Sequence, residues 1–109
     1  MKMILAIVSH DDSSDVISGL TESGFMVTKI ATIGGFLKKD NTTIILGVDD
    51  EKVDSAIKII YNKSHSRKQM VPVPVVMEHG LAYTSEGLID VTVGGATIFV
   101  LGVERFEKM

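Results

Sequence analysis

The sequence contains no cysteine, no long block of one charge and no long apolar run. Without cysteine there is no disulfide framework and no thiolate zinc site, which is compatible with a reducing cytoplasm. The formal net charge is -3, from 11 basic and 14 acidic side chains. Because neutralising phosphates requires clustered Lys and Arg, this composition argues against nucleic-acid binding through a basic face.

No apolar run approaches the roughly 20 residues that are needed to cross a bilayer, so no membrane insertion is expected. The chain begins with a Lys before apolar residues, but Ser9 ends this run early and no small-residue cleavage pattern follows. The run is therefore too short for a signal peptide. We expect a soluble cytoplasmic protein in which residues 3–8 form a buried first strand.

Patterns that indicate catalysis or metal binding are also missing. The chain has no Gly-x-Ser-x-Gly elbow, and its three histidines are expected in separate loops without a metal-binding pairing. The acid pairs Asp11-Asp12 and Asp49-Asp50 occur where helices are expected to begin, so helix capping explains them. We therefore expect no enzymatic activity, no catalytic residue, no metal site and no cofactor. The histidines are His10, His65 and His79.

The length of 109 residues, with 45% hydrophobic side chains, indicates a single domain over residues 1–109 with one continuous core. A chain of this size leaves most of its surface in contact with water, so its folding margin is thin. Assembly with further copies of the chain would bury more surface, and we expect an oligomer.

The first half of the chain predicts strands and helices from the spacing of its apolar residues. Residues 3–8 form a continuous apolar run, and residues 25–33 and 42–48 are rich in β-branched side chains. The latter two segments are expected to form a hairpin with Gly34-Gly35 near its turn. Helices are expected after the first and third strands, one capped by Asp11 or Asp12 and ended by Ser23-Gly24, and one capped by Asp49-Asp50.

The second half contains an extended segment with two prolines, Pro72 and Pro74. Their spacing puts both missing N–H donors on one edge of a strand, so this strand is expected to lie outermost. Polar residues predict loops over 62–69 and 78–87, on either side of it. The remaining predicted elements are a half-exposed strand over 89–93, a turn at Gly94-Gly95 and a last strand over 96–103.

Without the proline-containing excursion the predicted order is βαββαβ, which indicates an α+β fold of the ferredoxin-like type. Both helices of this fold cover one face of an antiparallel sheet. The other face must then be covered or accept a partner, and a trimer packed sheet against sheet is one solution.

Phosphate binding is the functional class that the residue pattern favours most, although the usual Gly-rich nucleotide motifs are missing. The segment 31–43 combines Gly34-Gly35 with threonines, Asn41 and Phe36. Glycine lets backbone N–H groups approach an anion, Asn can hydrogen-bond a base edge in both senses, and Phe36 offers a face for stacking. From the residue pattern alone, the favoured interpretation is a plain hairpin turn with Phe36 and Leu37 folded back onto the core.

Three strings of this sequence resemble a known family. They are the Thr-Lys-Ile-Ala-Thr-Ile-Gly-Gly-Phe-Leu string over 28–37, the Asn-Thr-Thr string over 41–43, and the Val-Gly-Gly-Ala-Thr-Ile-Phe-Val-Leu string over 93–101. Together they resemble the PII-like cyclic-di-AMP receptor proteins of Gram-positive bacteria (PstA/DarA-like), in the nitrogen regulatory PII-like superfamily. The similarity runs essentially from end to end.

The resemblance implies a non-enzymatic homotrimer that binds cyclic-di-AMP in the clefts between neighbouring subunits and acts on a downstream protein. Asn41 and the backbone around Gly47 are expected to read one adenine. Phe36 and Leu37 are expected to pack against a base. The Gly35 region, with Thr28, is expected to meet phosphate or ribose. Carried over by position, the ligand-binding residues are therefore Thr28, Gly35, Phe36, Leu37, Asn41 and Gly47.

Two positions depart from the pattern of the family. Met26 stands where the family commonly has an Arg, and a thioether cannot pair with phosphate. Lys108 stands where some relatives have a Gln, and it restores some positive charge. Loss of a charge-assisted contact costs about 1.5–3 kcal/mol, or roughly one to two decades of affinity. We therefore expect weaker binding of cyclic-di-AMP or a different ligand.

Two alternative functions remain open at this point. One is a PII-like regulator that binds ATP or another small metabolite and has no affinity for cyclic dinucleotides, as Met26 suggests. The other is a purely structural trimer whose glycines only make turns. PII-like proteins signal by ordering long loops, so the predicted loops over 62–69 and 78–87 are candidate moving parts, although ordinary mobile surface explains them equally well.

Overall fold

The computed structural model of the chain describes residues 1–30, 41–77 and 80–109. Without the strand pair between residues 67 and 93, the elements follow the order βαββαβ, which confirms the predicted ferredoxin-like α+β fold. In chain order the elements are β1 (Lys2–Ser9), α1 (His10–Glu22), β2 (Val27–Ile30), β3 (Asn41–Val48), the short 3-10 helix η1 (Asp50–Lys52), α2 (Val53–Ser64), β4 (Arg67–Met77), β5 (Gly80–Val93) and β6 (Ala96–Gly102).

Strand β1 lies at the centre of a four-stranded sheet with the order β2-β3-β1-β6. It pairs antiparallel with β3 on one side and with β6 on the other, and β2 pairs antiparallel with β3. This last pairing confirms the predicted hairpin, in which Val27 lies opposite Leu46. Its expected turn at Gly34-Gly35 lies outside the described residues.

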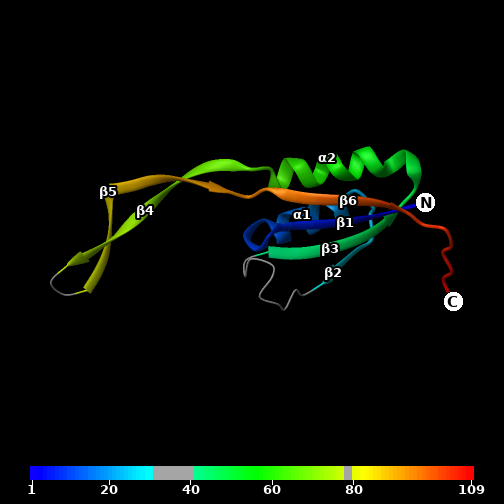
Figure 1. Cartoon of the computed structure of the whole chain (residues 1–109), viewed down its shortest axis with the longest axis horizontal. Coiled ribbons are helices and arrows are strands. Elements are labelled where there is room, and N and C mark those ends of the chain that lie inside the picture. The colour runs from blue at the N-terminus through cyan, green and yellow to red at the C-terminus, as the bar shows by residue number, and fades with distance from the viewer. Residues whose placement is uncertain (31–40, 78–79) are drawn as a thin grey trace.

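The core lies between the sheet and the two helices, which pack side by side (Figure 1). Side chains alternate between the two faces of a strand, so Ile4, Ala6 and Val8 of β1 point to the helices and are buried. They meet Val16 and Leu20 of α1, and the core is completed by residues of β3 and α2. Each fully buried Val, Leu or Ile contributes about 1.5–3 kcal/mol to folding.

Helix α1 ends at the predicted glycine stop. Gly24 has φ +90°, a left-handed conformation that glycine adopts without strain. Its N–H donates to the Thr21 carbonyl, and the Phe25 N–H donates to the Leu20 carbonyl, both at 3.0 Å. These two bonds satisfy carbonyl groups at the helix end and turn the chain into β2.

The predicted roles of the acid pairs were wrong in detail. Helix α1 begins at His10, so Asp11 and Asp12 lie in its first turn, where they face the positive end of the helix dipole. Asp49 precedes η1, but no side chain donates or accepts a capping hydrogen bond there or at α1. His10 also was expected in a loop and instead opens the helix.

Strands β4 and β5 form an antiparallel two-stranded arm that projects from the body (Figure 1), and the chain extends 63 Å along its longest axis. Pro72 lies opposite Leu88 and Pro74 opposite Tyr83, with a register shift between the prolines. The proline segment therefore pairs within its own chain. In the part of the chain that the structure describes, β4 pairs with β5 alone, which agrees with the predicted outermost position of the proline strand.

The two predicted loops beside this segment are largely strand and helix. Helix α2 continues to Ser64 and β4 begins at Arg67, within the predicted loop 62–69. Strand β5 begins at Gly80, within the predicted loop 78–87, of which 78 and 79 lie outside the described residues. The polar residues over 62–69 and 78–87 show no alternation of apolar side chains, which is why these segments were predicted as loops. Among the described residues, no helix is long and apolar enough to span a membrane.

Replacement of Gly24 by Ala tests the helix stop. A Cβ at φ +90° is strained even though space around it is open, so Gly24→Ala should lower the free energy of unfolding by about 1–2 kcal/mol. Denaturant unfolding measures this change. Gly102→Ala is the control, because Gly102 lacks a positive φ and its added Cβ would lie 3.8 Å from Lys2 Nζ. Equal effects of the two substitutions would contradict the assignment.

Candidate functional site

The face of the sheet opposite the helices is apolar and lies uncovered by the described part of the chain. Across the four strands, Thr28, Ile45, Leu5 and Phe99 lie in one row. Phe99 lies on β6, an edge strand of the sheet, and is 53% exposed. We call this surface the open face; its other paired members on β1 and β6 are Met3, Ile7, Thr97 and Leu101.

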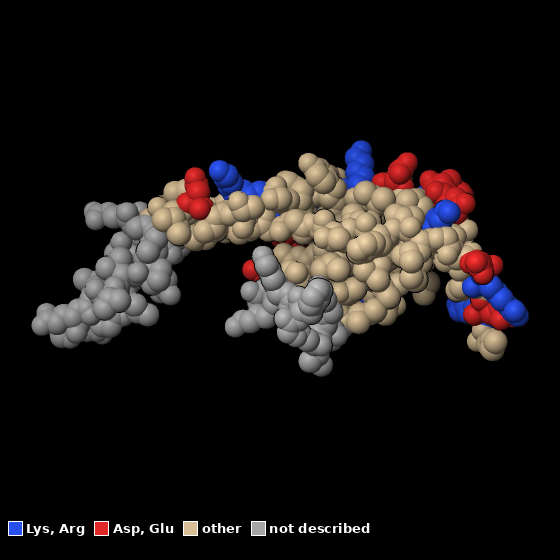
Figure 2. All heavy atoms as spheres, in the orientation of Figure 1, with Lys and Arg blue, Asp and Glu red and all other residues tan. Residues whose placement is uncertain are grey.

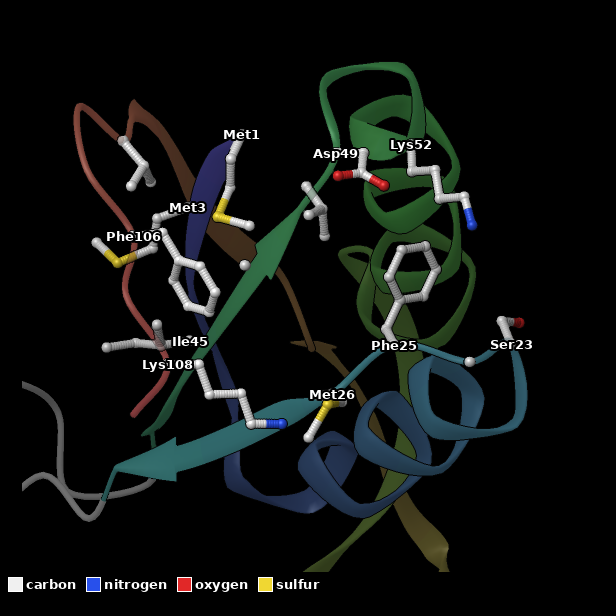
Figure 3. Close-up of a pocket in the computed structure, with 14 residues that line it drawn as sticks. Met1, Met3, Ser23, Phe25, Met26, Ile45, Asp49, Lys52, Phe106 and Lys108 are labelled. Atoms are coloured by element: carbon white, nitrogen blue, oxygen red, sulfur yellow. The ribbon is translucent and has the colours of Figure 1, made fainter.

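A cavity of about 640 Å³ lies at the end of the open face where β1 begins and β3 ends (Figure 3). Its walls come from four segments that are distant in sequence: the start of β1, the turn after α1, the end of β3 and the tail after β6. Most of the lining is apolar, and the charged groups are Asp49, Lys52 and Lys108. The apolar residues include Met1, Met3, Phe25, Ile45 and Phe106.

Gly47 exposes the backbone of β3 to this cavity. It pairs with Met3, and a Cβ built on it would have the Met1 sulfur, at 3.9 Å, as its nearest neighbour. The protein therefore has room for a side chain at this position. The absence of one leaves the space to the cavity and lets another molecule approach the strand closely.

The first residue forms part of the cavity wall and is held at both of its backbone groups. The Met1 ammonium group lies 2.9 Å from Asp50 Oδ1, and the Met1 carbonyl accepts a hydrogen bond of 3.2 Å from the Val103 N–H. The hydrogen bond and the charge of the ammonium group lower the pKa of Asp50 from its ordinary value of 3.8. These contacts place the Met1 side chain beside Gly47 and tie β1 to the tail.

The predicted ligand residues are only partly brought together. Thr28 lies on the open face beside Ile45, which lines the cavity, and Gly47 lines it two residues further along β3. Asn41 begins β3, opposite Ser9, at the other end of the same strand. Six residues of extended strand span about 20 Å. Asn41 and Gly47 of one chain therefore lie far apart, and their expected joint reading of one adenine stays a prediction that needs two neighbouring subunits. Gly35, Phe36 and Leu37 lie outside the described residues.

Met26 and Lys108, the two departures from the family pattern, both line the cavity. Met26 is 81% exposed, and Figure 3 shows the Lys108 side chain extending toward it. Sequence reasoning missed Phe25, Lys52 and Phe106 as lining residues. Phe106 was the only one with a signal, since it is a large apolar residue in a polar tail.

Charged side chains are distributed unevenly around these features. In Figure 2 the body of the molecule facing the viewer is largely uncharged, and acidic and basic groups lie at its margins and along the tail. Within the described ranges no group of three or more His, Asp or Glu is arranged to hold a metal ion. The cavity combines a mostly apolar lining with two lysines, Lys52 and Lys108, and one carboxylate, Asp49.

The sequence of the whole chain, residues 1–109, matches the family described as cyclic-di-AMP receptor. The chain belongs to this family. A GlnB-like protein of the nitrogen fixation nifHD2 region of Methanosarcina barkeri is 34% identical over 79 residues, which cover 61% of this chain and 75% of that protein. This likeness supports membership of the PII-like superfamily, as predicted.

The fold of this cyclic-di-AMP receptor family member also matches a solved structure. The crystal structure of a functionally unknown protein from Pediococcus pentosaceus ATCC 25745 superposes with a TM-score of 0.80 and 32% sequence identity. The match covers 99% of this chain and 96% of that one, so it includes the arm as well as the sheet and helices.

The contact between Met1 and Asp50 predicts a pH dependence. The folded-state pKa of Asp50 is depressed, so the stability contributed by this contact is present above pH 3.8 and is lost as the pH falls through the lower folded value. NMR titration of the Asp50 carboxyl group should give a pKa below 3.8. Acetylation of the Met1 amino group removes its charge and should raise this pKa; an unchanged value would contradict the pairing.

Proposed function

We propose that this protein is a non-enzymatic signalling receptor, a single domain that binds cyclic-di-AMP at clefts between the subunits of a homotrimer. The observation that carries the proposal is the cavity beside Gly47, which opens at the end of an uncovered apolar sheet face in a member of the cyclic-di-AMP receptor family. Ligand binding is relayed to a downstream protein through rearranged loops.

The cavity suits one adenine of the ligand. Small-molecule sites commonly enclose 300–1,000 Å³ and combine apolar walls with a few polar groups, and 640 Å³ falls within that range. Phe106 and Met3 offer faces for the flat purine ring, and methionine sulfur packs favourably against aromatic rings. Gly47 has no side chain, so the base can approach the backbone of β3 closely.

The cations at the rim suit the phosphate groups. Lys108 and Lys52 line the cavity, whereas Met26 offers no charge there. A lysine contributes a point charge in place of the bidentate grip of an arginine, so the phosphate is attracted but less firmly oriented. Lys108 is therefore proposed to take over part of the role that an Arg at position 26 fills in relatives.

The remaining predicted residues are proposed to contact the other half of the ligand. Thr28 lies on the open face, next to the row that leads to the cavity, and Asn41 lies at the far end of β3. Asn41 and Gly47 lie at opposite ends of β3 within one chain. A cyclic dinucleotide can therefore contact both residue types in two ways: each base contacts a different one, or the two residues come from neighbouring subunits. We place Gly35, Phe36 and Leu37 with Asn41 in this second half-site.

A homotrimer accounts for the open face. Large apolar side chains such as Phe99 and Leu101 are exposed on β6, an edge strand without proline in its run. Contiguous exposed apolar surface and unprotected strand edges mark sites of association. Three copies that pack these faces together would bury them and form clefts at the cavities.

A regulator that binds ATP or another small metabolite is the second candidate. Two lysines at a cavity of single-nucleotide size and the exposed Met26 favour it. Calorimetry distinguishes the candidates: cyclic-di-AMP should bind, with cyclic-di-GMP and ATP as comparisons. Binding of ATP alone would favour the second candidate, and a monomer in sedimentation equilibrium would contradict the intersubunit cleft.

Substitution of Gly47 tests the cavity directly. Gly47→Val adds a β-branched side chain that suits a strand and has room in the protein, but it fills the cavity. Affinity for cyclic-di-AMP should fall at least about tenfold, equivalent to 1.4 kcal/mol, while the melting temperature stays the same or rises. Gly102→Val is the control, because Gly102 is in the same sheet but does not line the cavity. Unchanged affinity in Gly47→Val would exclude this site.

Restoring an arginine tests the charge at the rim. Met26→Arg should tighten binding of cyclic-di-AMP by roughly one to two decades, because it adds a charge-assisted contact to phosphate. Lys108→Met should weaken binding and reduce its dependence on salt concentration. Calorimetry at two ionic strengths measures the affinity of both variants for cyclic-di-AMP. A Met26→Arg protein that binds no more tightly than the parent would show that the phosphate lies elsewhere.

A further inference from the structure

Within the described ranges 1–30, 41–77 and 80–109, the arm contacts the body at its base. Strand β4 begins at Arg67, shortly after α2 ends at Ser64, and β5 ends at Val93 before the turn into β6. The two strands contact each other extensively and make few contacts with the sheet and helices. In Figure 1 the arm points away from the sheet. The direction of the arm therefore depends on a small number of interactions at its base.

The strongest of these interactions is a bidentate ion pair between Arg67 and Asp12. Arg67 Nη2 donates to Asp12 Oδ1 at 2.8 Å, and Arg67 Nη1 donates to Asp12 Oδ2 at 3.1 Å. Asp12 is only 5% exposed, so its carboxylate depends on this partner. The hydrogen bonds that Arg67 donates to the Asp12 carboxylate raise the pKa of Arg67. Two parallel bonds between planar groups fix their orientation as well as their distance.

The backbone at the base is shaped around the guanidinium group. Arg67 Nη1 also donates to the His65 carbonyl at 3.2 Å. Gly94 has φ +75°, and a Cβ there would lie 2.5 Å from Arg67 Nη1 and 2.7 Å from the His65 oxygen. The Gly95 N–H donates to the Ser64 carbonyl at 2.6 Å. The end of α2, the start of β4 and the turn into β6 thus meet around one side chain.

The same turn of α1 that carries Asp12 also contacts the start of β3. His10 Nδ1 lies 3.2 Å from Thr42 Oγ1, and the Ser13 hydroxyl donates to the His10 carbonyl at 2.7 Å. Thr42 is buried and directly follows Asn41, one of the proposed ligand residues. The first turn of α1 is therefore in contact with the base of the arm on one side and with β3 on the other.

We propose that Asp12 and Arg67 form a clamp that fixes the direction of the arm, and that the first turn of α1 couples the arm to the start of β3. The first half of this proposal concerns the free protein. The second half rests on the proposed function, since it makes the clamp the route by which cyclic-di-AMP bound near Asn41 alters the arm. Asp12 and Arg67 are positioning residues and touch no ligand in this scheme.

The clamp is tested first without ligand, by electron–electron distance measurement between two spin labels. Because the chain has no cysteine, Lys58→Cys on α2 and Asp90→Cys on β5 would give two unique labelling positions, both exposed. Labelled chains are diluted with unlabelled ones so that only distances within one chain contribute. The parent should give a narrow distribution, and Arg67→Gln and Asp12→Asn should broaden it at least twofold.

Matched controls remove the same charges beside the clamp. Lys68→Gln and Asp11→Asn change exposed neighbours whose side chains make no hydrogen bond or ion pair with the rest of the described chain, and they should leave the distribution narrow. Arg67→Lys keeps the charge but loses the bidentate geometry, so it should fold and still broaden the distribution. A narrow distribution in folded Arg67→Lys and Arg67→Gln would overturn the clamp.

The coupling is tested by hydrogen exchange with and without cyclic-di-AMP. In the parent, saturating ligand should change amide exchange over residues 67–71 and 88–93 at least threefold. In Asp12→Asn this response should disappear while calorimetry still detects binding. An equal response in Asp12→Asn would overturn the coupling. Failure of the parent to bind any cyclic-di-AMP would instead contradict the proposed function, and the distance measurement would still decide on the clamp.

Discussion

The pairing of β1 with strands on both sides is the constraint on which the rest of the structure depends. Its alternating side chains cannot all face the helices, because neighbouring residues of a strand point to opposite faces. Ile4, Ala6 and Val8 enter the core, so Met3 and Leu5 must face outward with their apolar neighbours on β3 and β6. The alternation of side chains along β1 therefore contributes to both the core and the open face.

The cavity follows from the same arrangement. At the start of β1 the turn after α1, the end of β3 and the tail after β6 come together. Gly47 leaves the backbone of β3 accessible at this place. The central apolar strand β1 therefore has a cavity at its start that can hold a flat ligand. The sequence contains none of the usual nucleotide-binding motifs.

The sequence allowed most of the body of the fold to be predicted, because its signals are local. The apolar run over 3–8, the glycine stop at Gly24 and the βαββαβ order were all confirmed. The two strands of the arm were predicted only in part: the proline segment and residues 89–93 were expected as strands, whereas the polar start of β4 and the polar first half of β5 were mistaken for loops. The pairing of Asp12 with Arg67 was also missed, because it joins residues distant in sequence and Asp12 resembled a helix cap.

Prediction of the site was limited in the same way: local patterns could be read from the sequence, but contacts between distant segments could not. Resemblance to the family selected Gly47, which lines the cavity, and Thr28, which lies next to it. It also grouped Asn41 with Gly47, although the register of β3 puts them at opposite ends of the strand. That Met26 and Lys108 face the same cavity is a property of the fold, because no local pattern connects the turn after α1 with the tail.

The contribution of both Met1 and the tail to one cavity wall has a practical consequence for work on this protein. A purification tag or fusion partner joined to Met1 would replace the ammonium group that pairs with Asp50. One joined to Met109 would continue a tail whose Phe106 and Lys108 line the cavity. Affinities measured on tagged material would therefore report partly on the tag, and ligands are best compared on protein with identical termini.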